Sequence, residues 1–277
     1  MDGVEFYYFS GTGNSLYVAK ELQKRIPEAK LTPIVNLLNK GIIETNGEVV
    51  GIIFPIHRMT FPIPVKKFLE KLDLKSAKYI FAIATREGTK HIAFIEVEKI
   101  LEKKGKSLNS YFTLNMPCND PRSKDWHPAS EEEIAELESE VQSKLDSIQK
   151  IIIKQENSRE EDSDSSPSNY VLQHLLHLGM IISEHSGKKD YFFADSKCIG
   201  CGICEKVCLS RKIKMENKKP TWQEDVKCYM CYACLNYCPV HAIQIKSKTY
   251  MKSFTEENER YSHPYATADE IAEQKRQ

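Results

Sequence analysis

Eight of the nine cysteines fall into two short runs, CIGCGICEKVC at 198–208 and CYMCYACLNYC at 228–238. Both runs have the spacing C-x2-C-x2-C-x3-C, and the second repeats the first with a period of 30 residues. This is the bacterial spacing for [4Fe–4S] ligation, in which the fourth cysteine of each run ligates the cluster of the other run. The two runs therefore predict two iron–sulfur clusters.

The spacing also assigns each thiol, because three thiolates surround one face of a cubane while the fourth, on a short helical turn, points away. The expected sets are Cys198, Cys201, Cys204 and Cys238 for one cluster, and Cys228, Cys231, Cys234 and Cys208 for the other. Structural zinc is the alternative, but its four tetrahedral ligands normally come from two separated cysteine pairs. A duplicated run of this kind favours the clusters.

Residues 190–246 resemble a two-cluster bacterial ferredoxin domain, a small α+β fold. In this resemblance IKMENKKPTW at 213–222 is the hairpin between the two halves, and AIQI at 242–245 is the closing strand. A proline usually follows the fourth cysteine of each run. Pro239 fits that pattern, whereas Leu209 departs from it and alters only the turn next to its cysteine.

A second candidate site follows the first apolar segment, in YYFSGTGNSLYVAK. Its small residues are Ser10, Gly11, Thr12, Gly13, Asn14 and Ser15. A dinucleotide fingerprint needs a third glycine where Leu16 stands, and a P-loop needs Gly-Lys-Ser/Thr, so neither motif is present. Hydroxyls and backbone N–H groups at a helix N-terminus can still hold a phosphate without a lysine. The alternative is a Gly/Ser turn that only caps the helix.

This loop resembles the phosphate loop of flavodoxins, and the resemblance extends to about residue 120. It implies bound FMN, with FPIHRMTFPIPV at 54–65 as the second flavin loop and ATREGTKH at 84–91 as the third. The residues expected at the flavin from these two loops are Pro55, His57, Arg58, Thr85, Arg86, Glu87 and Gly88. Arg58 or Arg86 beside the flavin N1 would stabilise the reduced anion; the alternative is a solvated surface charge.

The elements that position these residues alternate apolar runs with amphipathic ones. The runs at 4–9, 49–55, 79–84 and 108–114 are near-continuously apolar, as strands buried on both faces are. Helices are predicted at 16–26, 64–72 and 91–104, the last ending at Gly105. The pattern predicts an α/β fold, and the flavodoxin resemblance implies a doubly wound parallel sheet of order 2-1-3-4-5, which holds FMN at its switch point.

Four segments are expected: a flavodoxin-like domain at 1–155, a linker and helix at 156–189, a ferredoxin domain at 190–250 and an extended polar tail at 251–277. The first ends in an amphipathic helix at 130–155, for which Ser130 and Glu133 form a predicted capping box. Cys118 is interpreted as a half-buried cysteine, with a flavin-edge thiol as the alternative. His174 and His177, three apart on a predicted helix at 170–183, are interpreted as a solvated face and not as metal ligands.

Composition narrows the classes of partner and compartment. Lys plus Arg and Asp plus Glu each number 39, so the bare chain offers no net field for nucleic acid or an anionic membrane. The N-terminus has no secretory pattern, and the longest apolar run, at 49–56, is too short to span a bilayer. We expect a soluble, cytoplasmic protein, with neither nucleic acid nor membrane as a partner.

The two resemblances together identify the chain as similar to an anaerobe family in which a flavodoxin-type domain is fused to a two-cluster ferredoxin. They imply an electron-transfer protein that exchanges one-electron and two-electron carriers, since FMN carries one or two electrons and each cluster one. The alternatives are an FMN and iron–sulfur reductase with a small-molecule acceptor, and a non-redox scaffold with structural clusters. Bound cofactors would make the protein acidic by about six charges, so redox partner proteins are expected to carry basic patches.

Overall fold

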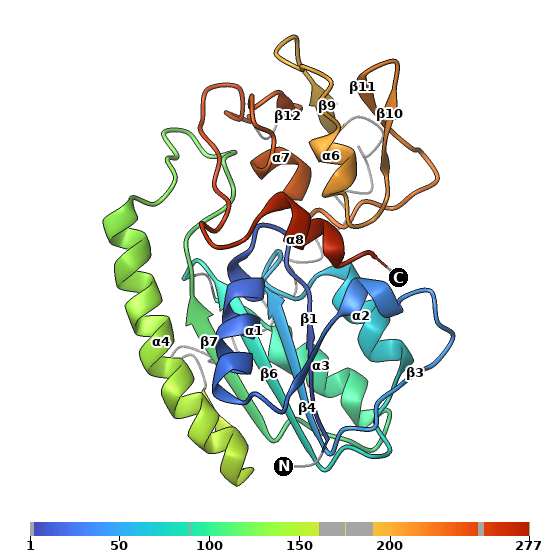
Figure 1. Ribbon diagram of the computed structural model, residues 1–277, viewed down its shortest axis with the longest axis vertical. Helices are drawn as coiled ribbons and strands as arrows, with labels where there is room; N and C mark the ends of the chain where they lie inside the picture. Colours follow the sequence, from blue (N-terminus) through green and yellow to red (C-terminus); the bar gives the residue numbers. More distant parts are fainter. Residues whose placement is uncertain (1–2, 89, 161–174, 176–190, 249–251, 277) are drawn as a thin grey trace.

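The computed structural model describes residues 3–88, 90–160, 175, 191–248 and 252–276 (Figure 1). Its larger part is a parallel sheet in the order β2-β1-β4-β6-β7-β8. The strands are β1 (Val4–Tyr8), β2 (Lys30–Pro33), β4 (Val49–Pro55), β6 (Tyr79–Arg86), β7 (Ser110–Asn115) and β8 (Ser158–Arg159). The first five strands of this sheet have the predicted order 2-1-3-4-5, and β8 extends it at one edge.

The central strands are buried along nearly their whole length. Every residue of β4 except its last is buried, and β6 has the same pattern. Gly51 in β4 lies directly under the ring of Phe81 in β6, where a Cβ atom would come within 2.2 Å of the ring. The continuous apolar runs therefore form strands covered on both faces, as predicted.

Helices cover this sheet in two pairs. The helices α1 (Asn14–Arg25) and α4 (Glu131–Lys154) lie side by side, as do α2 (Ile63–Lys71) and α3 (Ala93–Glu102). The predicted capping box at the start of α4 is present: Ser130 Oγ accepts the N–H of Glu133, and the Glu133 carboxylate accepts the N–H of Ser130. Beyond α3, Gly105 has φ +67° and the next N–H closes back on the Leu101 carbonyl at 3.0 Å. The helix thus stops where the sequence predicts.

The polar stretch expected to be a linker begins inside the sheet. Ser158 pairs with Ser110 of β7, whose Oγ accepts the Ser158 N–H at 2.8 Å. Tyr79 Oη and Ser110 Oγ both donate to the Glu156 carbonyl. Local polarity gives no sign of such an edge strand, because the strand is held by backbone bonds and not by apolar side chains. The remaining linker residues from 161, the predicted helix at 170–183 and His174 and His177 lie outside the described residues.

The cysteine-rich part forms the predicted small α+β unit. Its hairpin joins β10 (Ile213–Glu216) to β11 (Lys219–Trp222), and β9 (Phe192–Ala194) pairs antiparallel with the closing strand β12 (Ile243–Ile245). Two short helices, α6 (Ile203–Lys206) and α7 (Ala233–Asn236), carry one cysteine each and contact one another. The predicted hairpin and closing strand are therefore both present.

The C-terminal segment differs from the extended tail that the sequence predicts. It contains the helix α8 (Ala268–Glu273), which begins with a capping box between Thr267 and Glu270. Figure 1 shows α8 between the sheet and the cysteine-rich part. Tyr261, His263 and Gln274 are buried there. The composition of this segment is polar, but its few apolar and amide side chains find partners in both domains, which only the tertiary structure reveals.

Among the helices of the described residues, none is both long and apolar enough to cross a membrane.

Candidate functional site

The cysteines of each predicted set lie near one another in the structure, and their assignment as cluster ligands stays a prediction. One small hollow is lined by Cys198, Cys201, Cys204 and Cys238. Burial, followed by the charges of the other three cysteines of that set, raises the pKa of Cys204 to about 11. Cys238 Sγ also accepts the Ala242 N–H at 3.2 Å. The Cys204 thiol is therefore protonated at neutral pH, so that cluster binding must displace its proton.

Neighbouring cysteines also affect the pKa of a thiol in the second set, which consists of Cys208, Cys228, Cys231 and Cys234. Burial raises the pKa of Cys234 well above its ordinary value, and the neighbouring charges of Cys208, Cys228 and Cys231 add to this effect. Cys228 Sγ accepts the Met230 N–H at 3.3 Å. In this way the fourth cysteine of the first run joins the first three of the second.

The predicted phosphate loop forms the N-terminus of α1 but is closely tied to its neighbours. Gly13 has φ +106°, and its N–H donates to Ser10 Oγ at 3.1 Å. Ser15 Oγ lies 2.7 Å from Thr85 Oγ1 of the third predicted loop, and Thr12 Oγ1 accepts from the Asn119 amide at 2.6 Å. The loop is thus a rigid, buried turn with backbone N–H groups at a helix start.

A cavity of about 1330 Å³ joins the three predicted flavin loops. The predicted residues that line it are Ser10, Gly11, Thr12, Asn14, Ser15, Pro55, His57, Arg58, Thr85, Arg86 and Glu87. Gly13 and Gly88 lie outside this lining. Gly13 is covered by His263 and Ala266 instead, and Gly88, with φ +91°, has open space where a side chain would be.

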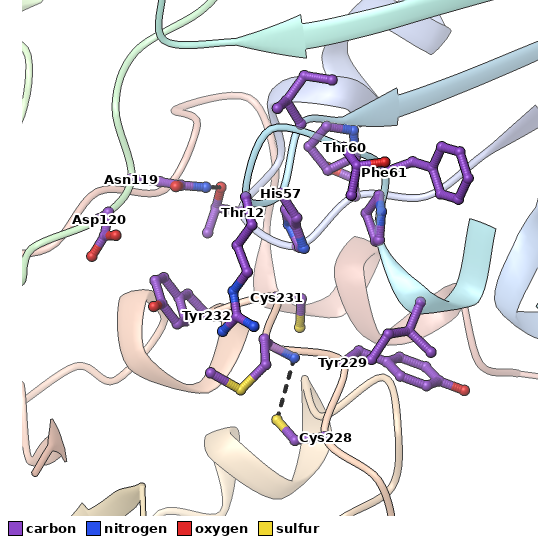
Figure 2. A pocket seen from close by; sticks show the side chains of 18 of the residues that line it. Thr12, His57, Thr60, Phe61, Asn119, Asp120, Cys228, Tyr229, Cys231 and Tyr232 are labelled. Atoms are coloured by element: carbon purple, nitrogen blue, oxygen red, sulfur yellow. Dashed lines mark hydrogen bonds between the residues drawn. The ribbon is translucent and has the colours of Figure 1, made fainter. Parts of the chain in front are cut away.

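The same cavity is lined by residues of the second cysteine run, from 228 to 232. Figure 2 shows Thr12 and His57 on one side and Cys228, Tyr229 and Cys231 on the other. Sequence reasoning missed this, and of the segment 117–120 after β7 it considered only Cys118, so that it missed Pro117, Asn119 and Asp120. The available signal for that segment was its position, because a loop after a strand of a parallel sheet lies at the same edge as the other loops.

The two parts of the chain are in direct contact at this cavity. A Cβ atom on Gly11 would lie 2.2 Å from the Cys231 carbonyl oxygen, so only glycine allows the approach. The ring of Tyr229 meets that of Phe9 edge-on with centroids 6.3 Å apart. The Asn236 amide donates to the Asn119 carbonyl at 3.1 Å. The predicted phosphate loop and a cluster loop therefore form adjacent walls of one site.

The second predicted loop is a two-residue turn whose central residues, Arg58 and Met59, have φ of +52° and +67°. His57 and Thr60 close it with two backbone hydrogen bonds of 2.8 and 3.0 Å. Burial, followed by the charge of Arg58, lowers the pKa of His57 to about 4. His57 is therefore a neutral imidazole at the cavity wall at neutral pH.

Cys118 lies in the cavity lining and is half-buried. Burial raises its pKa, so the thiol is protonated and unreactive at neutral pH. The position of Cys118 thus fits both interpretations, a packed cysteine and a thiol beside the cavity.

Residues 197–243 match the family described as a 4Fe-4S dicluster domain. The chain joins a flavodoxin-like domain to a ferredoxin domain. For the ferredoxin domain, the match confirms the prediction of iron–sulfur ligation over that of zinc. The flavodoxin-like domain has the strand order and the paired helices described above.

Several solved structures are similar to the chain. A flavodoxin from Archaea has 12% identity over 52% of this chain and 99% of its own, with a TM-score of 0.34. The two-electron reduced flavodoxin of Megasphaera elsdenii has 17% identity over 50% of this chain and 98% of its own, with a TM-score of 0.33. An FMN-dependent NADH-azoreductase of Bacillus anthracis has 10% identity over 53% of this chain and 99% of its own, with a TM-score of 0.35. Among curated proteins, no sequence matches the chain.

Proposed function

We propose that the protein transfers electrons between two [4Fe–4S] clusters in its ferredoxin domain and an FMN held in the cavity of its flavodoxin-like domain. The observation that carries this proposal is that one cavity is lined both by the predicted flavin loops and by the loop of Cys228 and Cys231. When bound, FMN exchanges one or two electrons and each cluster exchanges one, so the pair converts between the two kinds of carrier.

The cavity residues fit such a cofactor. The cavity has a volume of about 1330 Å³ and is therefore large enough for such a cofactor, since ligand sites usually have volumes of about 300–1,000 Å³. The start of α1 provides backbone N–H groups and the positive end of a twelve-residue helix for a phosphate. Arg58 and Arg86 line the cavity and are placed to balance negative charge.

The chain itself contributes proximity and exclusion of water. The contact of Gly11 with Cys231 fixes the second cluster loop against the phosphate loop. Tyr229 and Phe9 fill the space beside it with aromatic side chains. Covalent fusion of the domains raises the effective concentration of one redox centre at the other.

The test is the cofactor content and coupling of anaerobically purified, reconstituted protein. We expect about eight irons, eight acid-labile sulfides and one FMN per chain. In a rapid-mixing experiment, a low-potential chemical donor should reduce the clusters and then the flavin within a catalytic timescale. A preparation with full iron but no flavin would support the scaffold hypothesis instead. Clusters that cannot pass electrons to a bound flavin would contradict the proposal.

A reductase with a small-molecule acceptor is the second candidate, and the size of the cavity favours it. The volume beyond the usual range leaves room for a second molecule at the cavity wall formed by α2 and α3. This function predicts acceptor-dependent turnover by the purified protein in the absence of any protein partner. Electron transfer to carrier proteins alone predicts none.

We further propose that the redox partners are proteins with basic patches. The reason is charge: the two clusters and the FMN phosphate add about six negative charges to a chain whose formal net charge is zero. The rate of electron transfer to such a partner should fall as ionic strength rises.

A further inference from the structure

Three cations lie around the second cluster set, and two of them come from outside the ferredoxin domain. Lys212, from the ferredoxin domain itself, donates to the Val226 carbonyl at 2.7 Å, beside the second cysteine run. Lys275, from the C-terminal segment, donates to the Cys208 carbonyl at 3.1 Å and to the Glu205 carbonyl at 2.9 Å. Arg58, from the flavodoxin-like domain, lines the cavity together with Cys228.

The position of Arg58 is supported by its electrostatic neighbours. Burial lowers the pKa of Arg58, and the charge of Cys228 acts against this effect. Arg58 and Cys228 line the same cavity, so the charge of one acts on the other across the domain boundary.

The backbone at Arg58 adds an independent observation. A two-residue turn with positive φ at both central residues favours Asn and Gly, yet here Arg58 and Met59 occupy those positions. A left-handed conformation is unfavourable for residues that carry a side chain. Strain of this kind is concentrated at functional sites, and Arg58 lines the same cavity as Cys228.

The first cluster set has a different environment. Cys201 is exposed to solvent, and so is the neighbouring Ile199. Arg260, which belongs to the C-terminal segment as well, interacts electrostatically with Cys238 of this set. Its guanidinium donates to the Ile243 and Thr255 carbonyls. Different side chains therefore control the electrostatics of the two sets.

We propose that Arg58 and Lys275, from two segments outside the ferredoxin fold, set the reduction potential of the cluster held by Cys208, Cys228, Cys231 and Cys234. Reduction adds one electron, and the net charge of the cluster with its thiolates goes from about −2 to about −3. A nearby cation stabilises the more negative state and raises the potential. The docking of the domains thus sets the potential of the cluster nearest the flavin cavity. This inference rests on the proposed function for its role, but cluster potentials can be measured without it.

The experiment is a dithionite titration of the anaerobic holo protein, followed by electron paramagnetic resonance so that the two clusters are read separately. In Arg58→Gln and in Lys275→Met, the potential of one cluster should fall by ~59 mV or more, which is a tenfold change in its one-electron equilibrium constant. Arg58→Lys should restore most of the shift, because it retains the charge. Arg276→Gln is the matched control: it removes one charge next to Lys275, from a side chain that is 65% exposed, and should leave both potentials unchanged.

The outcomes are distinct. Equal shifts of both clusters in Arg58→Gln, or no shift of either, would overturn the inference, as would an equal shift in Arg58→Gln and Arg58→Lys. A protein without flavin that still shows the selective shift would contradict the proposed function and leave this inference standing. Should Lys275→Met fail to fold, the two Arg58 variants decide the question alone.

Discussion

The backbone of Gly11 lies against the carbonyl oxygen of Cys231, with space for a hydrogen but not for a methyl group. Gly11 belongs to the predicted phosphate loop and Cys231 to the second cysteine run, 220 residues later in the chain. This contact makes the two predicted sites neighbours. It also limits what each loop can tolerate.

Gly11→Ala should therefore separate or distort the two loops. A Cβ atom at 2.2 Å from a backbone oxygen cannot be relieved by a side-chain rotation, so we expect a loss of about 1–3 kcal/mol in the free energy of unfolding. Urea unfolding and limited proteolysis of the holo protein measure it. Gly41→Ala is the control, because a Cβ atom there meets nothing within 4 Å. Equal stability of the two variants would show that the contact does not form.

The cluster assignment predicts a selective loss of iron. Cys231→Ala removes a ligand of the second set and should lower the iron content from about eight to about four per chain, with the spectrum of the other cluster retained. Cys118→Ala should leave iron and sulfide unchanged, since Cys118 belongs to neither set. Iron and sulfide assays of anaerobic preparations check both. Loss of iron in Cys118→Ala would contradict the assignment.

Gln274 of the C-terminal segment is hydrogen-bonded to the backbone of the predicted phosphate loop. Its amide accepts the Ser10 N–H at 3.0 Å and donates to the Ser10 carbonyl at 2.8 Å, in a buried position. Gln274→Leu leaves both backbone groups buried without these bonds, at about 1–3 kcal/mol each. We expect at least a tenfold weaker affinity for FMN, measured by flavin fluorescence. Glu273→Gln, on the exposed side of the same segment, should bind FMN as the unaltered protein does.

Because His263 is buried, we expect the folded protein to lose stability in mild acid. Its side chain is fully buried beside Glu138, and burial lowers its pKa to about 4, below the ordinary value of about 6.5. The folded state thus holds His263 neutral, while the unfolded chain binds a proton below pH 6.5. Its contribution is complete above pH 6.5 and is lost as the pH falls toward 4, by about 1 kcal/mol at pH 5.5.

The measurement is anaerobic urea unfolding at pH 7 and pH 5.5 for the protein and for His263→Gln. The variant should lose about 1 kcal/mol less between the two pH values, because glutamine does not titrate. The comparison uses the difference between pH values, so a general destabilisation by the substitution does not affect it. Equal pH dependence in both proteins would show that His263 is protonated in the folded state.

Much of the fold could be predicted because its signals are local. Continuous apolar runs identified four strands of the sheet, β1, β4, β6 and β7, but not β2, whose residues are at most half-buried. The capping box at Ser130 identified the start of α4. The edge strand β8 was missed because its two residues are polar and are held by the backbone and by Ser110. The extended tail was a wrong expectation, since burial of Tyr261 and Gln274 depends on partners from both domains.

Part of the candidate site could likewise be predicted from the sequence, and part of it could not. The spacing of the cysteines alone predicts which thiols form each set, because a few residues of chain limit how far apart the sulfurs lie and in which direction they point. Only the tertiary structure decided that the second cysteine run shares a cavity with the predicted phosphate loop, that Pro117, Asn119 and Asp120 line it as well, and that Gln274 at the end of α8 is bonded to Ser10 of that loop. These contacts join residues more than 100 positions apart, as Asn14 and Pro117 do. They depend on how whole surfaces fit together, and no short stretch of sequence encodes that fit.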